Sequence, residues 1–145
     1  GIRLSELINI KISDVDFNNQ SIKVLGKRNK ERIIPLSSNV VNDLNIFIEN
    51  NHKNKYLFTN LEGDKLYNKL VYRLVNKYIA KISSVNKKSP HILRHTFATH
   101  MLNNGADINA IKELLGHANL SATQVYTHNT IEKLKTVYKQ AHPRA

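Results

Sequence analysis

The sequence predicts a mainly α-helical domain with one small antiparallel β-sheet, an α+β fold. Three observations lead to this fold class. Short alternating segments lie between residues 15 and 36, apolar residues recur at helical spacing between 66 and 79, and helix start and stop signals follow one another after residue 89. A chain of 145 residues of which 41% are hydrophobic suggests one domain with a packed core.

The first part of the chain carries the signals of a small sheet. LSELINI at 4–10 indicates the end of a helix, with Ser5 as a cap or first-turn residue. The turn residues NNQ and KRNK then separate three strand-like segments. These are VDF at 15–17, SIKVLG at 21–26 and ERIIPL at 31–36.

Two longer helices are expected in the middle of the chain. Ser37 or Ser38 is suited to cap the first, which carries apolar residues such as Val40, Val41, Ile46 and Phe47. The second is a long amphipathic helix, because a set of apolar side chains repeats at helical spacing. Its members are Leu66, Leu70, Val71, Leu74, Val75, Tyr78 and Ile79.

Clear punctuation marks the helices of the C-terminal part. Ser89-Pro90 is a helix start that leads to about Asn103 and a stop at Gly105, since Ser can cap and Pro suits the first helical position. Ser121 and Gln124 form a capping-box pattern that predicts a short helix carrying Tyr126. Further helices are expected from Asp107 to Gly116 and from Ile131 to about Ala141.

The charge of the chain favours a polyanionic partner. Lys and Arg number 22 against 11 Asp and Glu, which gives a net charge of +11, and no acidic residue lies between Asp64 and Asp107. Nucleic acid is the first candidate, although a highly soluble basic protein would have the same composition. Five basic residues recur every four positions and predict a slanted basic ridge that faces phosphate groups. They are Lys65, Lys69, Arg73, Lys77 and Lys81.

Composition also excludes several classes. With no cysteine there is no disulfide framework, thiolate metal site or cysteine nucleophile, and a reducing, cytoplasmic location is the simplest expectation. No apolar run approaches the roughly 18 residues of a membrane span. Carboxylates with the spacing of metal ligands are absent from the sequence, which argues against a two-metal nuclease.

Individual residues suggest phosphate chemistry, each with a plainer reading. His91 and Arg94 share a helix face, and a guanidinium can grip two phosphate oxygens, but H-x-x-R is also an ordinary surface pair. His117 follows Gly116 at the expected end of a helix, where a histidine is common without any catalytic role. Tyr126 is either a packed aromatic or a nucleophile. Because the ordinary pKa of its hydroxyl is about 10, it can act as a nucleophile only where nearby cations favour its oxyanion.

Four ordered segments extend these signals over nearly the whole chain. GIRLSEL, GKRNKERIIPL, SPHILRHTFATHMLNNGADINAIKELLGHANLSATQVYTH and the ending HPRA together resemble the catalytic domain of the tyrosine recombinases, the phage integrase family, and most of all its Xer-type members. The resemblance implies that residues 1–145 form a C-terminal catalytic domain. It further implies that an N-terminal DNA-binding domain and the first catalytic-domain helices are absent, and that such a fragment binds DNA weakly and cleaves poorly alone.

The resemblance implies a role for each matching residue. Arg3 and Arg94 would hold the scissile phosphate. Lys27 would protonate the departing 5′ oxygen, and Tyr126 would attack the phosphorus. His91 would assist proton transfer, and His117 would hydrogen-bond the phosphate. Lys30 lies in the same turn as Lys27, so the choice of Lys27 rests on the resemblance alone. Glu6 is expected as a structural partner close to Arg3. The implied catalytic set is Arg3, Lys27, His91, Arg94, His117 and Tyr126.

The implied reaction is site-specific DNA recombination through a covalent 3′-phosphotyrosyl intermediate, in Xer-like chromosome dimer resolution or mobile-element integration. No metal or cofactor is expected, because the phosphotyrosyl bond stores the energy for rejoining. The implied partners are double-stranded DNA and a homo- or hetero-tetramer of recombinase protomers, although the fragment alone would be monomeric. In that tetramer residues 131–141 would pack on a neighbour, with Val137 among the anchors. Two alternatives stay open, a non-catalytic helix-turn-helix domain and a type IB topoisomerase.

Overall fold

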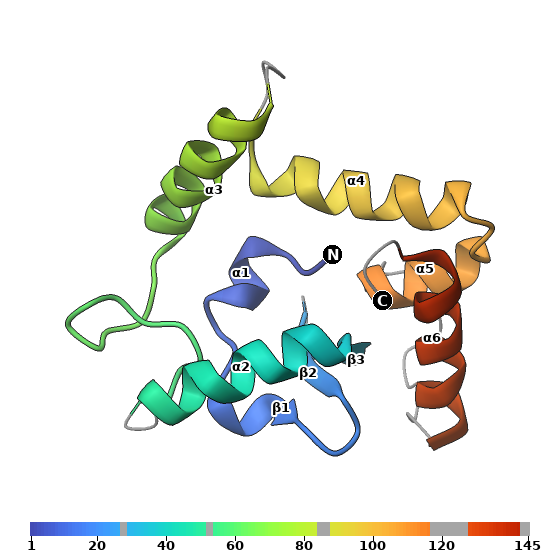
Figure 1. The fold of residues 1–145 in the computed structure, drawn as a ribbon, viewed down its shortest axis with the longest axis horizontal. Coiled ribbons are helices and arrows are strands. Elements are labelled where there is room, and N and C mark those ends of the chain that lie inside the picture. Colours follow the sequence, from blue (N-terminus) through green and yellow to red (C-terminus); the bar gives the residue numbers. More distant parts are fainter. Residues whose placement is uncertain (27–28, 52–53, 84–87, 117–127, 143–145) are drawn as a thin grey trace.

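The computed structural model describes residues 1–26, 29–51, 54–83, 88–116 and 128–142. Within these residues the protein is mostly helical with one three-stranded antiparallel sheet, which confirms the predicted fold class. Figure 1 shows the sheet together with α1 and α2, while α3 and α4 run along the upper side of the view and α5 and α6 lie at its right.

The sheet is formed by β1 (Val15–Asp16), β2 (Ser21–Leu25) and β3 (Glu31–Pro35) in the order β1-β2-β3. All three strands lie where the sequence predicts them. Alternation sets the inward face, because successive side chains of a strand point to opposite sides. On β2, Ile22 and Val24 are buried, and Val24 pairs with Arg32 on β3. A charged residue therefore occupies an inward position of the sheet.

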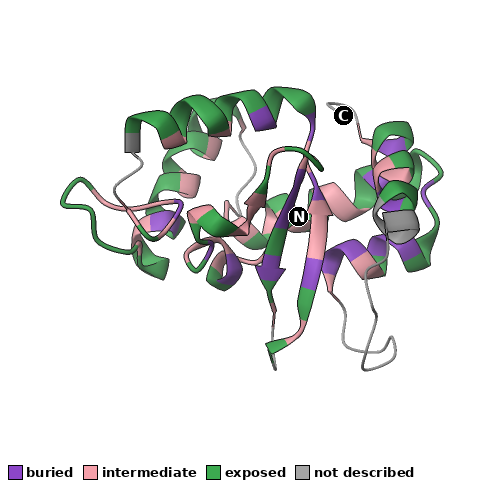
Figure 2. Cartoon of the chain, turned by 90° about the horizontal axis from the view of Figure 1, so that it is seen from below, coloured by how far each residue is buried: buried purple, intermediate pink, exposed green. Residues whose placement is uncertain are grey.

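A first hydrophobic cluster, here called the sheet cluster, packs against this sheet. Its buried members are Ile10, Ile22, Val24 and Leu57. Partly buried side chains from the short helix α1 (Leu4–Leu7), the 3₁₀ turn η1 (Ile12–Asp14) and α2 (Ser38–Asn51) surround it. In Figure 2 the strands at the centre of the view carry buried residues.

The helix α3 (Asn68–Ile82) matches the predicted long helix but buries less of it than expected. Val71 is its buried residue, whereas Leu74 and Tyr78 are 41% and 61% exposed. The reason is that α3 lies along the edge of the molecule, where it meets α1. Four of the five predicted ridge residues sit at exposed positions of α3, and Lys65 precedes the helix.

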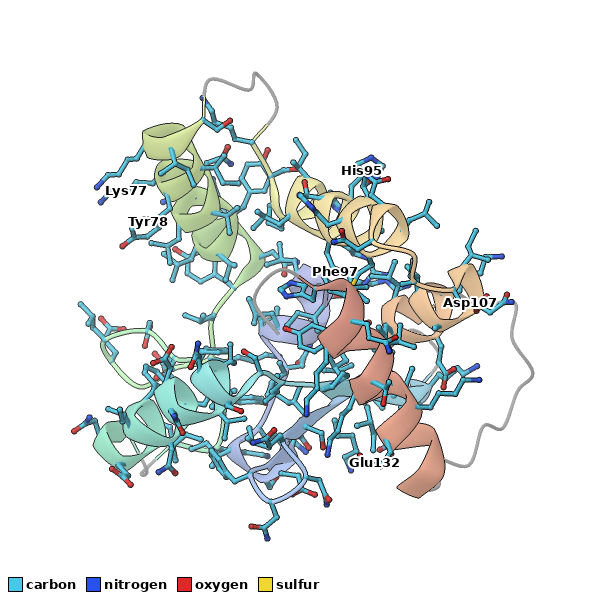
Figure 3. All side chains as sticks on the ribbon, turned by 45° about the vertical axis from the view of Figure 1, so that its right-hand side comes forward. Lys77, Tyr78, His95, Phe97, Asp107 and Glu132 are labelled. Atoms are coloured by element: carbon cyan, nitrogen blue, oxygen red, sulfur yellow. The ribbon has the colours of Figure 1, made fainter. Side chains whose placement is uncertain are left out.

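Three helices enclose a second hydrophobic cluster, the helical cluster. They are α4 (Pro90–Asn103), α5 (Ile108–Leu115) and α6 (His128–Ala141). Met101 is fully buried at its centre, and Leu114 on α5 and Leu134 on α6 are each 3% exposed. Phe97 points from α4 towards the C-terminal end of α6, where its ring lies 5.7 Å from that of His142 (Figure 3).

The predicted boundaries of α4 and α5 are confirmed, with one difference in how they are stabilised, whereas α1 is a short helix of its own and α6 begins at His128 rather than at Ile131. Asp107 caps α5 by accepting hydrogen bonds from the backbone N–H groups of Asn109 and Ala110. Ser89 occupies the N-cap position of α4 and Pro90 the first helical position, but the Ser89 side chain makes no capping hydrogen bond. The predicted short helix around Tyr126 lies outside the described residues.

The last helix, α6, packs on its own chain. It contacts α4, α5 and β3, and Leu134, Val137 and Ala141 join the helical cluster. Within the chain, Val137 packs against the helical cluster, and the packing of residues 131–141 on a neighbouring protomer stays a prediction. The apolar side of α6 finds its partner in α4 and α5, which the periodicity of the helix alone does not specify. Across the described ranges, no helix is both long and apolar enough to cross a membrane.

Candidate active site

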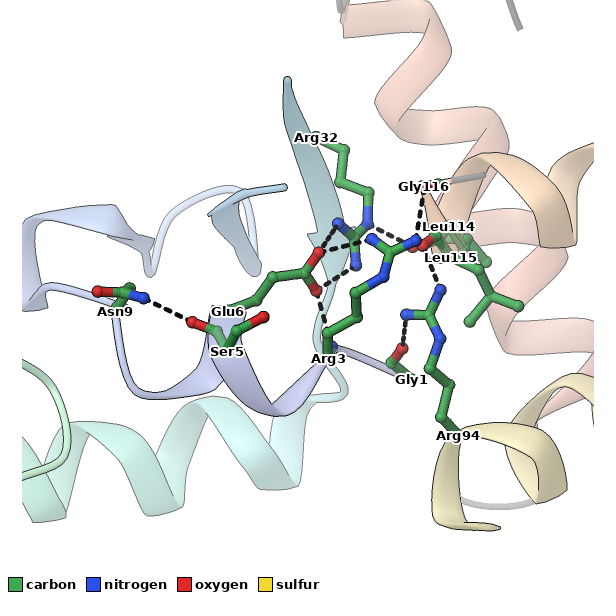
Figure 4. A network of polar contacts seen from close by, with 10 residues as sticks. All are labelled: Gly1, Arg3, Ser5, Glu6, Asn9, Arg32, Arg94, Leu114, Leu115 and Gly116. Carbon is green, nitrogen blue, oxygen red and sulfur yellow. Dashed lines mark hydrogen bonds and ion pairs between the residues drawn. The ribbon is translucent and has the colours of Figure 1, made fainter. Parts of the chain in front are cut away.

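A network of charged side chains connects α1, β3 and the end of α5 (Figure 4). At its centre the Glu6 carboxylate accepts hydrogen bonds from the backbone N–H of Arg3 at 2.7 Å and from its Nη1 at 2.8 Å. Arg32 also binds this carboxylate, with Nη1 at 2.7 Å from Oε1 and Nη2 at 2.8 Å from Oε2. Glu6 is therefore the structural partner of Arg3, as predicted, and it is shared with a second arginine.

Arg32 is a component of this network that the sequence reading did not single out. Its side chain is 3% exposed and that of Glu6 is 2% exposed, so the pair is buried. The alternation of ERIIPL carried the signal. Arg32 lies two residues before Ile34, so the two side chains fall on the same face of the strand.

Three arginines converge on the C-terminal end of α5. The carbonyl of Leu114 accepts from Arg32, that of Leu115 from Arg94 and that of Gly116 from Arg3. The last carbonyls of a helix lack partners within it and carry the negative end of its dipole, so cationic donors are favoured there. Arg94 also donates to the carbonyl of Gly1, which joins α4 to the segment that carries Arg3.

Two glycines lie against the Arg32–Glu6 pair. Gly116 has a left-handed backbone (φ 65°), and a Cβ atom built on it would lie 2.9 Å from Nη1 of Arg32. A Cβ on Gly26 would lie 3.5 Å from Oε1 of Glu6 and 3.6 Å from Nη1 of Arg32. In the sequence Gly26 precedes Lys27 and Gly116 precedes His117, so both segments that lead to these residues pass beside the pair.

The electrostatics of the network leave an excess of positive charge. Burial alone would raise the pKa of Glu6, but hydrogen bonds from Arg32 and Arg3 outweigh it and lower that pKa to about 2. Burial, followed by the charges of Arg3 and Arg32, lowers the pKa of Arg94 to about 10, a value at which it still carries its charge near neutral pH. Three guanidinium groups thus face one carboxylate, and an added anion would relieve their repulsion.

The arginines retain donors for such an anion. A guanidinium has five N–H donors, and Arg3 and Arg94 each use two of them in contacts with the described residues, so three on each have no partner among those residues. Arg3 keeps 34% of its side chain exposed and Arg94 is partly buried, whereas Arg32 is enclosed. The two predicted phosphate arginines are therefore the accessible members of the network.

The remaining predicted residues divide into one that is described and three that are not. His91 lies on the first turn of α4, exposed and three residues before Arg94, in the helical relation that the sequence predicts. Lys27, His117 and Tyr126 lie outside the described residues. His95 and His100, expected to have no catalytic role, are exposed on α4.

Comparison with known proteins decides the family. Residues 1–133 match the Phage integrase family. The chain belongs to this family. Tyrosine recombinase XerC of Pelotomaculum thermopropionicum is 43% identical to this phage integrase family member over 156 residues, covering 100% of the chain and 51% of the relative.

Solved structures of related recombinases share the fold. The crystal structure of XerA recombinase superimposes with a TM-score of 0.74 at 36% identity, covering 99% of this chain and 54% of that one. The XerH site-specific recombinase bound to difH substrate, in a pre-cleavage complex, gives a TM-score of 0.71 at 26% identity, covering 96% and 39%. This family member spans about half the length of the relatives it matches.

Proposed function

We propose that this chain carries the catalytic part of a site-specific recombinase, which cleaves and rejoins double-stranded DNA through a 3′-phosphotyrosyl intermediate on Tyr126. The observation that supports this most is the convergence of Arg3 and Arg94 at the end of α5, with an excess of positive charge and with donors on each that no described residue accepts from. The tyrosine recombinases among its relatives and its place in the phage integrase family support the same reaction class.

The chemistry follows from what phosphodiester cleavage requires. Charge on the non-bridging oxygens must be stabilised, and Arg3 and Arg94 can each grip two oxygens through their planar forks. The Tyr126 oxygen attacks phosphorus, a Tyr–O–P bond forms, and the P–O5′ bond breaks. The tyrosine proton leaves with help from His91, and Lys27 gives a proton to the departing 5′ oxygen. His117 adds a hydrogen bond to the phosphate.

The 3′-phosphotyrosyl bond conserves the energy of the broken phosphodiester. A 5′ hydroxyl of the same or another strand then attacks the phosphorus, restores the phosphodiester and releases the tyrosine. This sequence consumes no nucleotide, so a donor of chemical energy is not needed. Exchange between two DNA sites requires four tyrosines, and we place the chain in a homo- or hetero-tetramer of recombinase protomers for this purpose. Its DNA substrate and lack of cysteine suit a cytoplasmic location.

The DNA-facing surface is proposed to include the basic side of α3. Lys69, Arg73, Lys77 and Lys81 are all exposed there. Figure 3 shows the side chains of Lys77 and Tyr78 projecting from α3 away from the rest of the molecule. Such a row supplies phosphate contacts without reading sequence, which matches the positioning role of backbone contacts in DNA-binding proteins.

A covalent trapping assay tests the proposal. The protein is incubated at low salt with a nicked recombination site that loses its short 5′-hydroxyl product, and the products are run on a denaturing gel. Binding is first measured by fluorescence anisotropy, so that cleavage is scored on bound DNA. We expect a protein–DNA adduct from the natural sequence and none from Tyr126→Phe. DNA that is bound but never linked to the protein would instead support a non-catalytic DNA-binding domain.

A further inference from the structure

The buried Arg32–Glu6 pair contacts the segment that carries Arg3 and lies beside the segments that lead to Lys27 and His117. Glu6 holds both the backbone and the side chain of Arg3. Gly26 and Gly116, the neighbours in sequence of Lys27 and His117, approach the pair so closely that an added Cβ would lie within 2.9 to 3.6 Å of it. The carbonyl that Arg32 binds precedes the one that Arg94 binds.

We propose that Arg32 is a positioning residue of the recombinase: it fixes Glu6 and the end of α5 in one geometry, and thereby orients Arg3 towards the scissile phosphate. This inference rests on the proposed function. Arg32 does not itself reach DNA, because its side chain is 3% exposed and its Nε, Nη1 and Nη2 all donate within the protein. Its influence on the reaction must therefore pass through the residues it holds.

Stability alone does not explain a charged pair at this place. Removing two charges from water costs several kcal/mol each, and well-packed apolar residues of similar volume often serve as well or better. A guanidinium, however, offers a rigid planar fork that binds both carboxylate oxygens at once and still donates from Nε to a third acceptor. In this structure the fork holds Glu6 so that Oε1 and Oε2 also receive the Arg3 side chain and backbone.

The variant Arg32→Lys tests the geometry while keeping the charge, since lysine has a single ammonium group and no fork. With DNA saturating, we expect the rate of adduct formation to fall roughly 100-fold, the loss that a misplacement of about 1 Å can cause. The dissociation constant for DNA should change less than about threefold, because the phosphate contacts of the surface remain. The control Glu31→Gln breaks the exposed Lys23–Glu31 pair on the same hairpin and should leave the rate unchanged.

A second substrate separates positioning from a general loss of structure. A methylphosphonate at the scissile position carries no negative charge, so cleavage depends less on the arginine grip. If Arg32 acts through Arg3, the ratio of natural to Arg32→Lys rates shrinks on this substrate. An equal ratio on both substrates, with both proteins shown to be folded by circular dichroism, would mean that Arg32 only supports the fold and would overturn the inference.

The double variant Arg32→Met with Glu6→Leu covers the case in which a buried lysine prevents folding. It removes the two buried charges together, so neither is left in the core without the other, and the fold should persist. We expect it to melt near the temperature of the natural protein and to cleave as slowly as Arg32→Lys. Natural rates from this variant would overturn the positioning role. Absence of any adduct from the natural protein would instead refute the proposed function, and the inference with it.

Discussion

Glu6 shows at the residue scale how a single carboxylate organises a cationic site. It is almost fully buried, which on its own favours the protonated form, yet two guanidinium groups and a backbone N–H hold it as an anion with a pKa of about 2. Without this carboxylate, Arg3 and Arg32 would face each other with no charge between them. Glu6 thus allows arginines to gather at the proposed phosphate site.

The variant Glu6→Gln tests this assignment through the pH dependence of stability. The pKa of Glu6 is about 2 in the folded protein against an ordinary value of 4.5, so the unfolded chain binds more protons between these values. Stability from Glu6 is therefore complete above about pH 4.5 and is lost as the pH falls towards 2. Denaturant titrations should show a slope in this range that Glu6→Gln reduces, at a cost near neutral pH of about 3 to 5 kcal/mol for breaking a buried pair.

The control for this titration is Glu31→Gln, whose carboxylate pairs with Lys23 at an exposed position. It should keep the acid slope of the natural protein, because an exposed pair contributes little. An unchanged slope in Glu6→Gln would mean that the buried carboxylate is not the group that titrates.

Residue identities were predictable in the site to differing degrees. Arg3, His91 and Arg94 could be named from the H-x-x-R spacing and the ordered motifs, and the pairing of Arg3 with Glu6 was expected. The sharing of that carboxylate with Arg32 was not. Arg32 lies 26 residues from Glu6 in the sequence, and no local sequence pattern predicts a contact between a strand and a helix so far apart.

At the element scale, α5 is the helix whose ends are fixed most completely. Asp107 caps its first N–H groups, and three arginines cover the carbonyls of its last turn. Gly116 completes the C-terminal end in a left-handed conformation that other residues adopt only at a cost. The segment that follows Gly116 therefore starts from a fixed point of the molecule.

Gly116→Ala and Gly105→Ala form a matched pair that tests this point. Both glycines have positive φ (65° and 81°), but a Cβ at Gly105 meets nothing within 4 Å whereas one at Gly116 meets Arg32. Gly105→Ala should cost about 1 kcal/mol from the backbone alone. Gly116→Ala should cost more and should also slow adduct formation, as measured by thermal melting and covalent trapping. Equal effects at the two positions would show that the contact with Arg32 does not matter.

The elements themselves were largely predictable because their signals are local. Asp107 and Gly116 cap the two ends of α5 as the capping rules require, and alternation predicted the strands. The exposure of Leu74 and Tyr78 on α3 was not foreseen, and neither was the packing of α6 on its own chain. Both depend on which surfaces meet, and periodicity gives only the existence of an apolar face.

At the scale of the whole molecule, two hydrophobic clusters are joined by a charged network. The sheet cluster lies under α1 and α2, the helical cluster lies between α4, α5 and α6, and Arg32 links β3 to the end of α5 across the boundary. The net charge of +11 and the exposed basic row of α3 give the surface an affinity for polyanions.

The salt dependence of DNA binding tests the role of that row. In the double variant Lys69→Gln with Lys77→Gln, two exposed cations are lost from α3. The slope of log K against log salt should fall by about 1 for each phosphate contact removed, hence by about 2. The same two changes at Lys133 and Lys139, exposed on α6, serve as the control and should have a smaller effect. Equal losses from both pairs would indicate attraction by net charge alone.

The overall charge and fold class were accessible from composition and patterning, since both are sums over many residues. The joining of the two clusters through buried charges was not, because it depends on one inward position of β3 and on the place where α5 ends. Burial of an arginine inside a small sheet is also uncommon enough that composition argues against it.

The measurement that tests the central claim most directly is the location of the covalent bond. The adduct trapped on a nicked site is digested with a protease and a nuclease, and the peptide that carries a nucleotide is sequenced by mass spectrometry. The account predicts a nucleotide attached through its 3′ phosphate to Tyr126, on the peptide that follows Lys112. It also predicts a free 5′ hydroxyl on the released strand. Attachment through another residue, or a bond to the 5′ end of the DNA, would contradict it.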